Sequence, residues 1–267
     1  MQKKKIAYKN QYSNFKYGYH ITNKQNPCGN SGPKKFNYFL KPKYGKSTAC
    51  ANLPGALCID LEGGGYDYID AVKVKASSVK DLKEICAAIK EAKYPYKFIV
   101  LDTITRLEEM VKPLALKLYL NSPAGQKFTG DDVLDAPMGA GYSALRKALE
   151  MVIDMVSKCA PNIILICHTK DSAIGNTDMT AKTIDLFGKA GRILASKSDA
   201  IGYLDRDEDS NTILSFNTND KFVECGARPE HLRNADIVLG EMKEDGNIEF
   251  HWERIYPSLL NPVEVNI

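Results

Sequence analysis

The segment KPKYGKST, residues 41–48, constrains the fold more than any other part of this sequence. It follows a short apolar run, FNYFL at 36–40, that predicts a strand, and a helix is predicted from about Gly45. A Gly-Lys-Ser turn between strand and helix presents backbone N–H groups and a helix N-terminus to a phosphate group. The sequence therefore predicts an α/β protein that holds a phosphorylated ligand at this turn.

Each residue of this loop has an expected role in a nucleotide site. Lys46 would reach the β and γ phosphates, the Ser47 hydroxyl would bind Mg²⁺, and Thr48 would lie near the α phosphate. Further contacts to the phosphates are expected from Pro42, Lys43, Tyr44 and Gly45. Leu40 stands where the usual GxxxxGKS/T pattern has its first glycine, which puts hydrolysis in question more than nucleotide binding. The alternative is a lysine-rich turn that binds no ligand.

Two later apolar runs end in acidic side chains. They are ALCIDLE at 56–62 and KFIVLD at 97–102. The carboxyl ends of parallel strands face the crevice in which such sheets bind ligands. We expect Asp102 to bind Mg²⁺ together with Ser47, although an Asp at this place can instead cap the next helix. Glu62, on the same side as Asp60 by strand alternation, is expected to activate water or else to be a solvated turn acid.

A third apolar run, NIILICH at 162–168, ends in His168. A polar side chain at this strand end could bond the γ phosphate and transmit its presence to the polar loop expected at 170–182. The alternative is a hydrogen-bonded structural histidine.

Helical periodicity alternates with these strands. Helices are predicted at 79–92, about 104–120, 138–159 and 188–196, and further strands at 200–205 and 212–217. This alternation implies right-handed crossovers and a mostly parallel sheet with helices on both faces. Beyond residue 221 the pattern predicts no definite element.

Residues 1–35 differ from the rest of the chain in charge. They contain eight lysines and no acid, although the net charge of all 267 residues is only +3. We therefore divide the chain into a basic N-terminal arm at 1–35 and an α/β domain at 36–267. Tyrosines between the lysines would suit single-stranded nucleic acid, whose phosphates attract cations and whose bases stack on rings. A contact to a neighbouring subunit and a disordered solubilising tail are the alternatives.

Composition argues against two classes of protein. No apolar run approaches the roughly 20 residues that cross a bilayer, and no apolar stretch follows the basic N-terminus as in a secretory signal. The seven cysteines form no CxxC pair and no cluster with metal-site spacing. They indicate reduced thiols in a cytoplasmic protein that has no membrane partner.

The order of these motifs resembles the RecA-like ATPase core, and most closely bacteriophage RecA-like proteins of the AAA or single-strand annealing type. The resemblance rests on FLKPKYGKST, LCIDLEGG, FIVLDTIT, IILICHTKD, GKAGRILASKSDAIGYLDRD and CGARPEHL, which span most of residues 36–232. It implies a RecA-like P-loop domain that uses ATP and Mg²⁺. It also implies that Glu62 activates water and that His168 senses the γ phosphate.

The resemblance further implies a nucleic-acid partner. The stretches 121–141 and 170–191 occupy the places of two DNA-binding loops. In or next to the second loop, Lys182, Lys189 and Arg192 would contact single-stranded DNA.

Self-association is implied as well, because RecA-like subunits hold nucleotide between neighbours in a ring or filament. Lys221 and Arg228 are the candidates for the cation that reaches a neighbour's nucleotide, although Arg228 could equally be a surface residue. A single-strand-binding protein would be a second protein partner.

We therefore expect an ATP-hydrolysing RecA-like protein that acts on single-stranded DNA in phage recombination or replication. A nucleotide-gated assembly module with weak ATPase activity, a replicative-helicase-type motor and a P-loop small-molecule kinase are the alternatives. The sequence shows no second domain for strand separation, and the late strands differ from the lid that kinases usually carry.

Overall fold

The computed structural model describes residues 32–40, 45–173, 180–219 and 222–260. Within them, one sheet has the strand order β11-β10-β8-β7-β1-β5-β4-β2-β3, with β6 paired to β5 and β9 paired to β7. The N-terminal arm up to residue 31 and the candidate residues Pro42, Lys43, Tyr44 and Lys221 lie outside the described residues.

The centre of the sheet is parallel. In spatial order its strands are β7 (Ala200–Arg206), β1 (Lys35–Leu40), β5 (Asn162–Ala173), β4 (Phe98–Asp102), β2 (Ala56–Asp60) and β3 (Lys73–Lys75). The antiparallel strands are β6 (Thr180–Ile184), β8 (Thr212–Ser215), β9 (Gly226–Ala227), β10 (Asp236–Met242) and β11 (Ile248–Phe250). The expected α/β fold with a mostly parallel sheet is confirmed.

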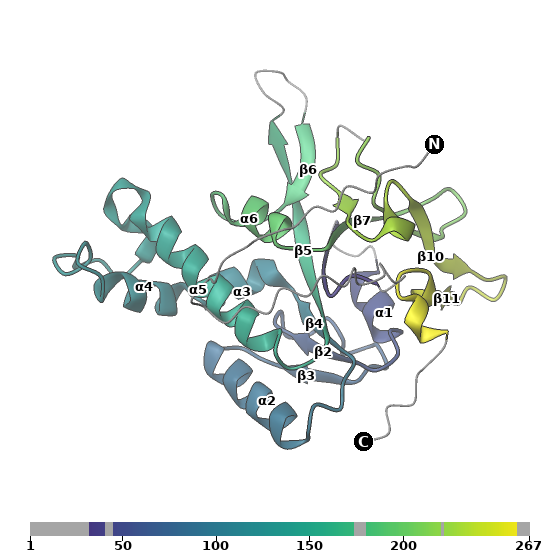
Figure 1. Cartoon of the computed structure of the whole chain (residues 1–267), viewed down its shortest axis with the longest axis horizontal. Coiled ribbons are helices and arrows are strands. Elements are labelled where there is room, and N and C mark those ends of the chain that lie inside the picture. The colour runs from purple at the N-terminus through teal and green to yellow at the C-terminus, as the bar shows by residue number, and fades with distance from the viewer. Residues whose placement is uncertain (1–31, 41–44, 174–179, 220–221, 261–267) are drawn as a thin grey trace, which may run out of the picture.

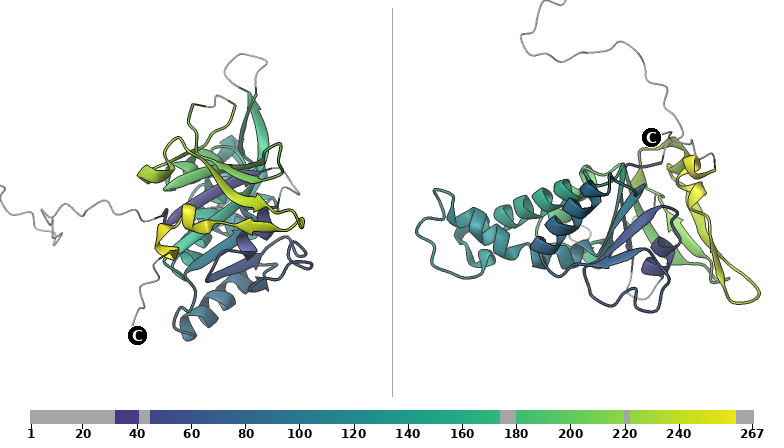
Figure 2. Two further views of the ribbon diagram at one scale, coloured as in Figure 1. Left: turned by 90° about the vertical axis from the view of Figure 1, so that its right-hand side faces the viewer. Right: turned by 90° about the horizontal axis from the view of Figure 1, so that it is seen from below.

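Helices cover both faces of this sheet (Figures 1 and 2). One face carries α2 (Val79–Glu91), α3 (Ile104–Met110), α4 (Lys112–Leu120), α5 (Ala140–Val156) and α6 (Ala190–Ser196). The other face carries α1 (Lys46–Ala51) and the C-terminal 3₁₀ turns η4 (Trp252–Arg254) and η5 (Pro257–Leu259). Shorter 3₁₀ turns are η1 (Val133–Asp135), η2 (Pro137–Gly139) and η3 (Glu230–Leu232).

Side-chain alternation along the strands divides the core into two layers. In β4, Ile99 and Leu101 pack under α2 to α5, whereas Phe98 and Val100 pack on the side of α1. All four side chains are buried. Because both faces are covered, the central strands are continuous apolar runs, which explains why the sequence predicted them clearly.

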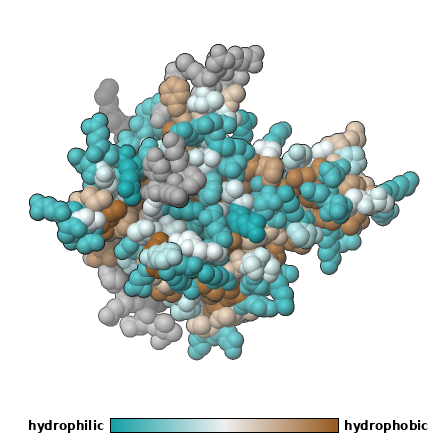
Figure 3. Space-filling model, turned by 180° about the vertical axis from the view of Figure 1, so that it is seen from behind, coloured by the Kyte–Doolittle hydropathy of each residue, from teal (hydrophilic) through white to brown (hydrophobic). Residues whose placement is uncertain are grey.

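A helical arm formed by α4 and the start of α5 projects from the sheet at the left of Figure 1. Seen from behind in Figure 3, hydrophilic residues cover most of the molecule, and hydrophobic residues gather on this arm. On α4, Leu114, Leu116 and Leu118 are half-buried and Leu120 is exposed. None of the helices in the described part of the chain is both long and apolar enough to cross a membrane.

Three sequence expectations were wrong in detail. The region expected as a loop at 170–182 contains the end of β5 and the start of β6, which pair as an antiparallel ladder. Its half-exposed polar residues gave no apolar pattern from which a strand could be predicted. The helix expected at 104–120 is two helices that meet at Val111, and the strand expected at 56–62 ends at Asp60.

We predict that Trp252 fastens the C-terminal turns to the rest of the domain. The indole is 1% exposed and its Nε1 donates to the Ala49 carbonyl oxygen over 2.8 Å, across 203 residues of sequence. Replacing Trp252 with Ala should lower the free energy of unfolding by about 3–5 kcal/mol, because it leaves a large cavity. Urea denaturation measures the change. Tyr68→Ala is the matched control, since Tyr68 is 101% exposed and should change stability little.

Candidate nucleotide-binding site

The carboxyl ends of β1, β2 and β4 meet at one edge of the sheet, where β5 continues past them to Ala173. Strand register pairs Asp60 with Asp102 across β2 and β4, and Leu40 with His168 across β1 and β5. Helix α1 begins at Lys46 directly beyond this edge, after Gly45. Gly45 has φ +90°, a left-handed conformation that glycine adopts without steric cost.

The Lys46 ammonium is the centre of this cluster. Its Nζ lies 3.1 Å from Glu62 Oε2, 3.2 Å from Asp102 Oδ1 and 3.1 Å from His168 Nε2. The Lys46 side chain is only 12% exposed. The structure therefore brings together Lys46, Glu62, Asp102 and His168, which the sequence predicted as one site from four separate segments.

Asp102 and Ser47 form the second part of the site. The Ser47 hydroxyl donates to Asp102 Oδ2 over 2.8 Å, and the Asp102 side chain is 3% exposed. Burial raises the pKa of Asp102, while Lys46 and Ser47 oppose that rise. Thr103, and not Asp102, caps α3, because the Thr103 hydroxyl accepts from the Arg106 N–H.

The residues at this position fit Mg²⁺. Magnesium prefers hard oxygen ligands, and a serine hydroxyl beside a carboxylate supplies two of them. Asp102 Oδ1 accepts no hydrogen bond among the described residues, and its contact is the ion pair with the Lys46 ammonium at 3.2 Å, so this oxygen already faces a cation. Ser47 and Asp102 are therefore the residues that would hold the metal ion.

Asp60 shapes the turn that presents Glu62. Its Oδ1 accepts from the N–H groups of Glu62 and Gly63, and its Oδ2 accepts from that of Gly64. Asp60 is 2% exposed, whereas the Glu62 side chain is 34% exposed. The expectation that the two acids share one side of a strand was wrong, since the strand ends at Asp60 and its carboxylate is used by the turn.

Glu62 is strongly held in its ionised form. A hydrogen bond with His168, then Lys46 and a bond from Thr103 Oγ1, lower the pKa of Glu62 to about 2 despite its partial burial. The Thr103 hydroxyl donates to Glu62 Oε1 over 2.9 Å. The sequence analysis gave Thr103 no role at this site, and its position directly after the strand-end Asp102 was the clue to this contact.

His168 contacts both Glu62 and Lys46. Its Nε2 lies 3.0 Å from Glu62 Oε1 and 3.1 Å from Lys46 Nζ. A protonated Nε2 donates to Glu62, whereas an unprotonated Nε2 accepts from Lys46. The proton on this nitrogen therefore selects one of two partners.

Arg206, at the end of β7, was missed by the sequence reasoning. One of its guanidinium nitrogens lies 3.6 Å from where a Cβ on Gly45 would be. Strand β7 runs parallel to β1, so their carboxyl ends lie at the same edge of the sheet. The available clue was that Arg206 ends a strand, β7, and that this strand lies next to β1, the strand before the GKST turn.

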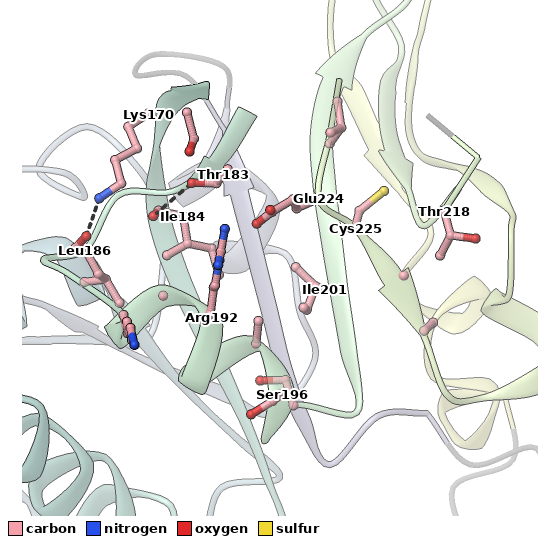
Figure 4. A pocket seen from close by; sticks show the side chains of 18 of the residues that line it. Lys170, Thr183, Ile184, Leu186, Arg192, Ser196, Ile201, Thr218, Glu224 and Cys225 are labelled. Carbon is pink, nitrogen blue, oxygen red and sulfur yellow. Dashed lines mark hydrogen bonds between the residues drawn. The ribbon is translucent and has the colours of Figure 1, made fainter. Parts of the chain in front are cut away.

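A cavity of about 740 Å³ lies between the β5–β6 pair, α6 and β9 (Figure 4). Two of the three expected DNA contacts, Lys189 and Arg192, line it, as do Lys170 and Arg228. Arg192 and Glu224 approach it from opposite walls (Figure 4). Lys182 does not line the cavity and lies 3.5 Å from Asp171.

Arg228, expected as a cation for a neighbouring subunit, is bound within its own chain. One nitrogen lies 3.4 Å from Asp199 Oδ1 and another donates to the Ser196 carbonyl oxygen over 2.9 Å. The side chain is still 64% exposed. A role on a neighbour's nucleotide stays a prediction.

The fold and the Lys46–Ser47–Asp102 arrangement are those of a P-loop nucleotide-binding protein. Residues 35–228 match the family described as AAA domain, and the chain therefore belongs to that family. This family places the chain in the class of nucleotide-binding ATPases. A comparison with curated proteins finds no match. Among solved structures, the crystal structure of the RadB recombinase is similar, with 14% identity and a TM-score of 0.43, over 83% of this chain and 92% of that one.

Glu108 on α3 is a buried acid beside the segment that follows β6, and the sequence analysis did not single it out. It is 2% exposed, and both carboxylate oxygens accept from the Phe187 N–H, at 2.9 and 3.1 Å. Burial raises the pKa of Glu108 to about 7 from an ordinary value near 4.5. The folded protein thus holds this proton more tightly than the unfolded chain does.

We predict that Glu108 makes stability fall as pH rises. Because the folded pKa is raised, the folded state binds more protons between about pH 4.5 and 7, and its stability decreases over that window. Glu108→Gln keeps an acceptor without the charge, so it should gain up to about 3 kcal/mol over wild type between pH 5 and pH 8. Denaturant unfolding at both pH values measures this. Glu109→Gln, an exposed neighbour paired with Lys112, is the control and should show no such trend.

Proposed function

We propose that this protein is a RecA-like enzyme that hydrolyses ATP with Mg²⁺ and acts on single-stranded DNA in phage recombination or replication. The observation that carries the ATPase part is the meeting of Lys46, Glu62, Asp102 and His168 within about 3 Å contacts at the strand ends. Membership in the AAA domain family supports it.

The residues of the site divide the chemistry between them. Lys46, with the backbone of the loop before it, binds the β and γ phosphates. Mg²⁺, when bound by Ser47 and Asp102, neutralises charge on the phosphate oxygens. Glu62 positions the attacking water and accepts its proton, and His168 contacts the γ phosphate.

Nucleotide binding would make Glu62 a stronger base. The ammonium of Lys46 now lies 3.1 Å from Glu62, and phosphate oxygens would compete for it. Withdrawal of that positive charge raises the pKa of the carboxyl, which starts at about 2. Glu62 therefore accepts a proton weakly in the free protein and more readily after nucleotide has bound. As a result, Glu62 acts as a general base only when nucleotide occupies the site.

The cavity lined by Lys170, Lys189, Arg192 and Arg228 is the proposed site for the DNA backbone. A groove with local positive charge suits phosphates even when the whole domain is not basic. Lys182, half-buried on β6, would extend this contact, and so would the N-terminal arm. The 121–141 stretch, which ends in the first turn of α5, is the proposed second contact.

The proposed partners include a second copy of this chain, in a ring or filament, with Lys221 or Arg228 reaching the neighbour's nucleotide. A single-strand-binding protein and a cytoplasmic location complete the proposal. A nucleotide-gated assembly module with weak hydrolysis is the second candidate, and Leu40 in place of the usual glycine favours it. A helicase-type motor is a further alternative.

We predict that Glu62→Gln separates binding from hydrolysis. The amide keeps the shape of the side chain and loses the base, so ATP turnover should fall at least about 100-fold while ATP affinity changes little. Lys46→Ala should lose both, because it removes the phosphate cation. Turnover by phosphate release and affinity by a fluorescent ATP analogue measure these outcomes.

The control for both variants is Glu84→Gln, an exposed acid on α2 away from the site. Undiminished turnover in Glu62→Gln contradicts the assignment of the base. Tight ATP binding with no turnover in wild-type protein would instead support the assembly module.

We predict that Lys189→Ala and Arg192→Ala weaken binding of single-stranded DNA. Each removes one phosphate contact, so the slope of log affinity against log salt should fall by about 0.7 per contact, the value for single strands. Fluorescence anisotropy of a labelled oligonucleotide from 50 to 300 mM salt measures the slope. Lys80→Ala, an exposed lysine on α2, is the control and should leave it unchanged. Equal slopes in all proteins would rule out this cavity as the DNA site.

A further inference from the structure

Helix α3 touches both the nucleotide site and the wall of the large cavity. At its start, the Thr103 hydroxyl donates to Glu62 Oε1 over 2.9 Å. Two positions before its end at Met110, the Glu108 carboxylate accepts from the Phe187 N–H. These contacts lie at opposite ends of one short helix, so the helix spans the distance between the two regions.

Thr105, in the first turn of α3, joins two further chain segments. Its hydroxyl accepts from the His168 N–H over 3.1 Å and donates to the Asp185 carbonyl oxygen over 3.2 Å. The Asp185 N–H in turn donates to the His168 carbonyl oxygen over 2.9 Å. One hydroxyl group thus completes a closed set of bonds between α3, β5 and the segment after β6.

The segment Asp185–Gly188, which we term the cavity wall, is held by its own side chains and by bonds to its backbone. Leu186 is buried in the core, Lys170 lies 3.7 Å from Asp185 Oδ1, and Lys112 lies over the Phe187 ring. Both oxygens of the buried Glu108 accept the Phe187 N–H, and Lys170 donates to the Leu186 carbonyl oxygen, as Figure 4 shows. Leu186 and Gly188 line the cavity, and Lys189 follows directly. The position of this segment therefore sets the shape of the cavity and the placement of its first cation.

We propose that Thr105 and Glu108 are positioning residues that transmit the state of the nucleotide site to the cavity wall. A phosphate that binds Lys46 and contacts His168 changes the partners of Glu62 and His168. Both of those residues are bonded to the first turn of α3, and Glu108 carries the helix's displacement to Phe187. The inference rests on the proposed nucleotide binding and is independent of which ligand the cavity takes.

The test compares backbone hydrogen–deuterium exchange of residues 185–190 in free protein and in protein saturated with Mg²⁺ and a non-hydrolysable ATP analogue. Wild-type protein should show about a three- to tenfold change in exchange rate on nucleotide binding, the factor that one hydrogen bond corresponds to. Thr105→Val removes the hydroxyl at equal size and should abolish this change while nucleotide affinity stays within about twofold of wild type.

Conservative variants distinguish transmission from a general loss of structure. Thr105→Ser keeps the hydroxyl and Glu108→Gln keeps an acceptor, so both should retain the nucleotide-dependent change, whereas Glu108→Leu should lose it. Thr105→Ala serves if the valine variant does not fold, as judged by circular dichroism. Ser157→Ala, which removes an exposed hydroxyl at the end of α5, is the control and should behave as wild type.

An unchanged nucleotide response in Thr105→Val and Glu108→Leu overturns the inference. So does a wild-type protein that binds the analogue without any change in exchange at 185–190, and in that case the proposed ATPase function still stands. A wild-type protein that does not bind the analogue contradicts the proposed function and the inference together.

Discussion

The charge balance around the Lys46 ammonium is the interaction on which the rest of the site depends. Glu62 from the turn after β2, Asp102 from the end of β4 and His168 from within β5 each lie within about 3 Å of this one cation. A buried carboxylate such as Asp102 is costly to ionise without a cation beside it. Lys46 therefore allows acidic groups to gather at the edge of the sheet, where phosphate groups can later replace them as partners of the ammonium.

The parallel sheet supplies the geometry for this balance. Because β1, β5, β4 and β2 run in the same direction, their carboxyl ends and the start of α1 lie together. Strand β5 separates β1 from β4, so that His168 on β5 lies between the neighbouring strands that end in Leu40 and Asp102. The strands and the turn held by Asp60 place these groups at hydrogen-bond distance from one another before a ligand arrives.

The large cavity is arranged differently from the nucleotide site. The cavity is bounded by a polar strand pair, a short helix and the cavity wall, and side-chain bonds from α3 hold that wall in place. Its cations Lys170 and Arg228 are paired with acids in their own chain, at 3.7 and 3.4 Å. Such surface pairs contribute little stability and exchange partners readily, so these cations remain available to an anionic ligand.

The sequence by itself determined the parallel strands and the helix after the GKST turn, because buried parallel strands are continuous apolar runs. It also determined which side chains to expect at the candidate site, because ligands bind at the carboxyl ends of such strands. These residues are Lys46, Ser47, Glu62, Asp102 and His168. Only the tertiary structure decided how those side chains pair, that Asp60 serves the turn, and that Thr105 and Glu108 join distant segments. These depend on strand order and on contacts between residues up to 122 positions apart, which no local pattern encodes. The antiparallel strands β10 and β11 belong to the second group for the same reason, since their half-exposed residues lack a periodic apolar pattern.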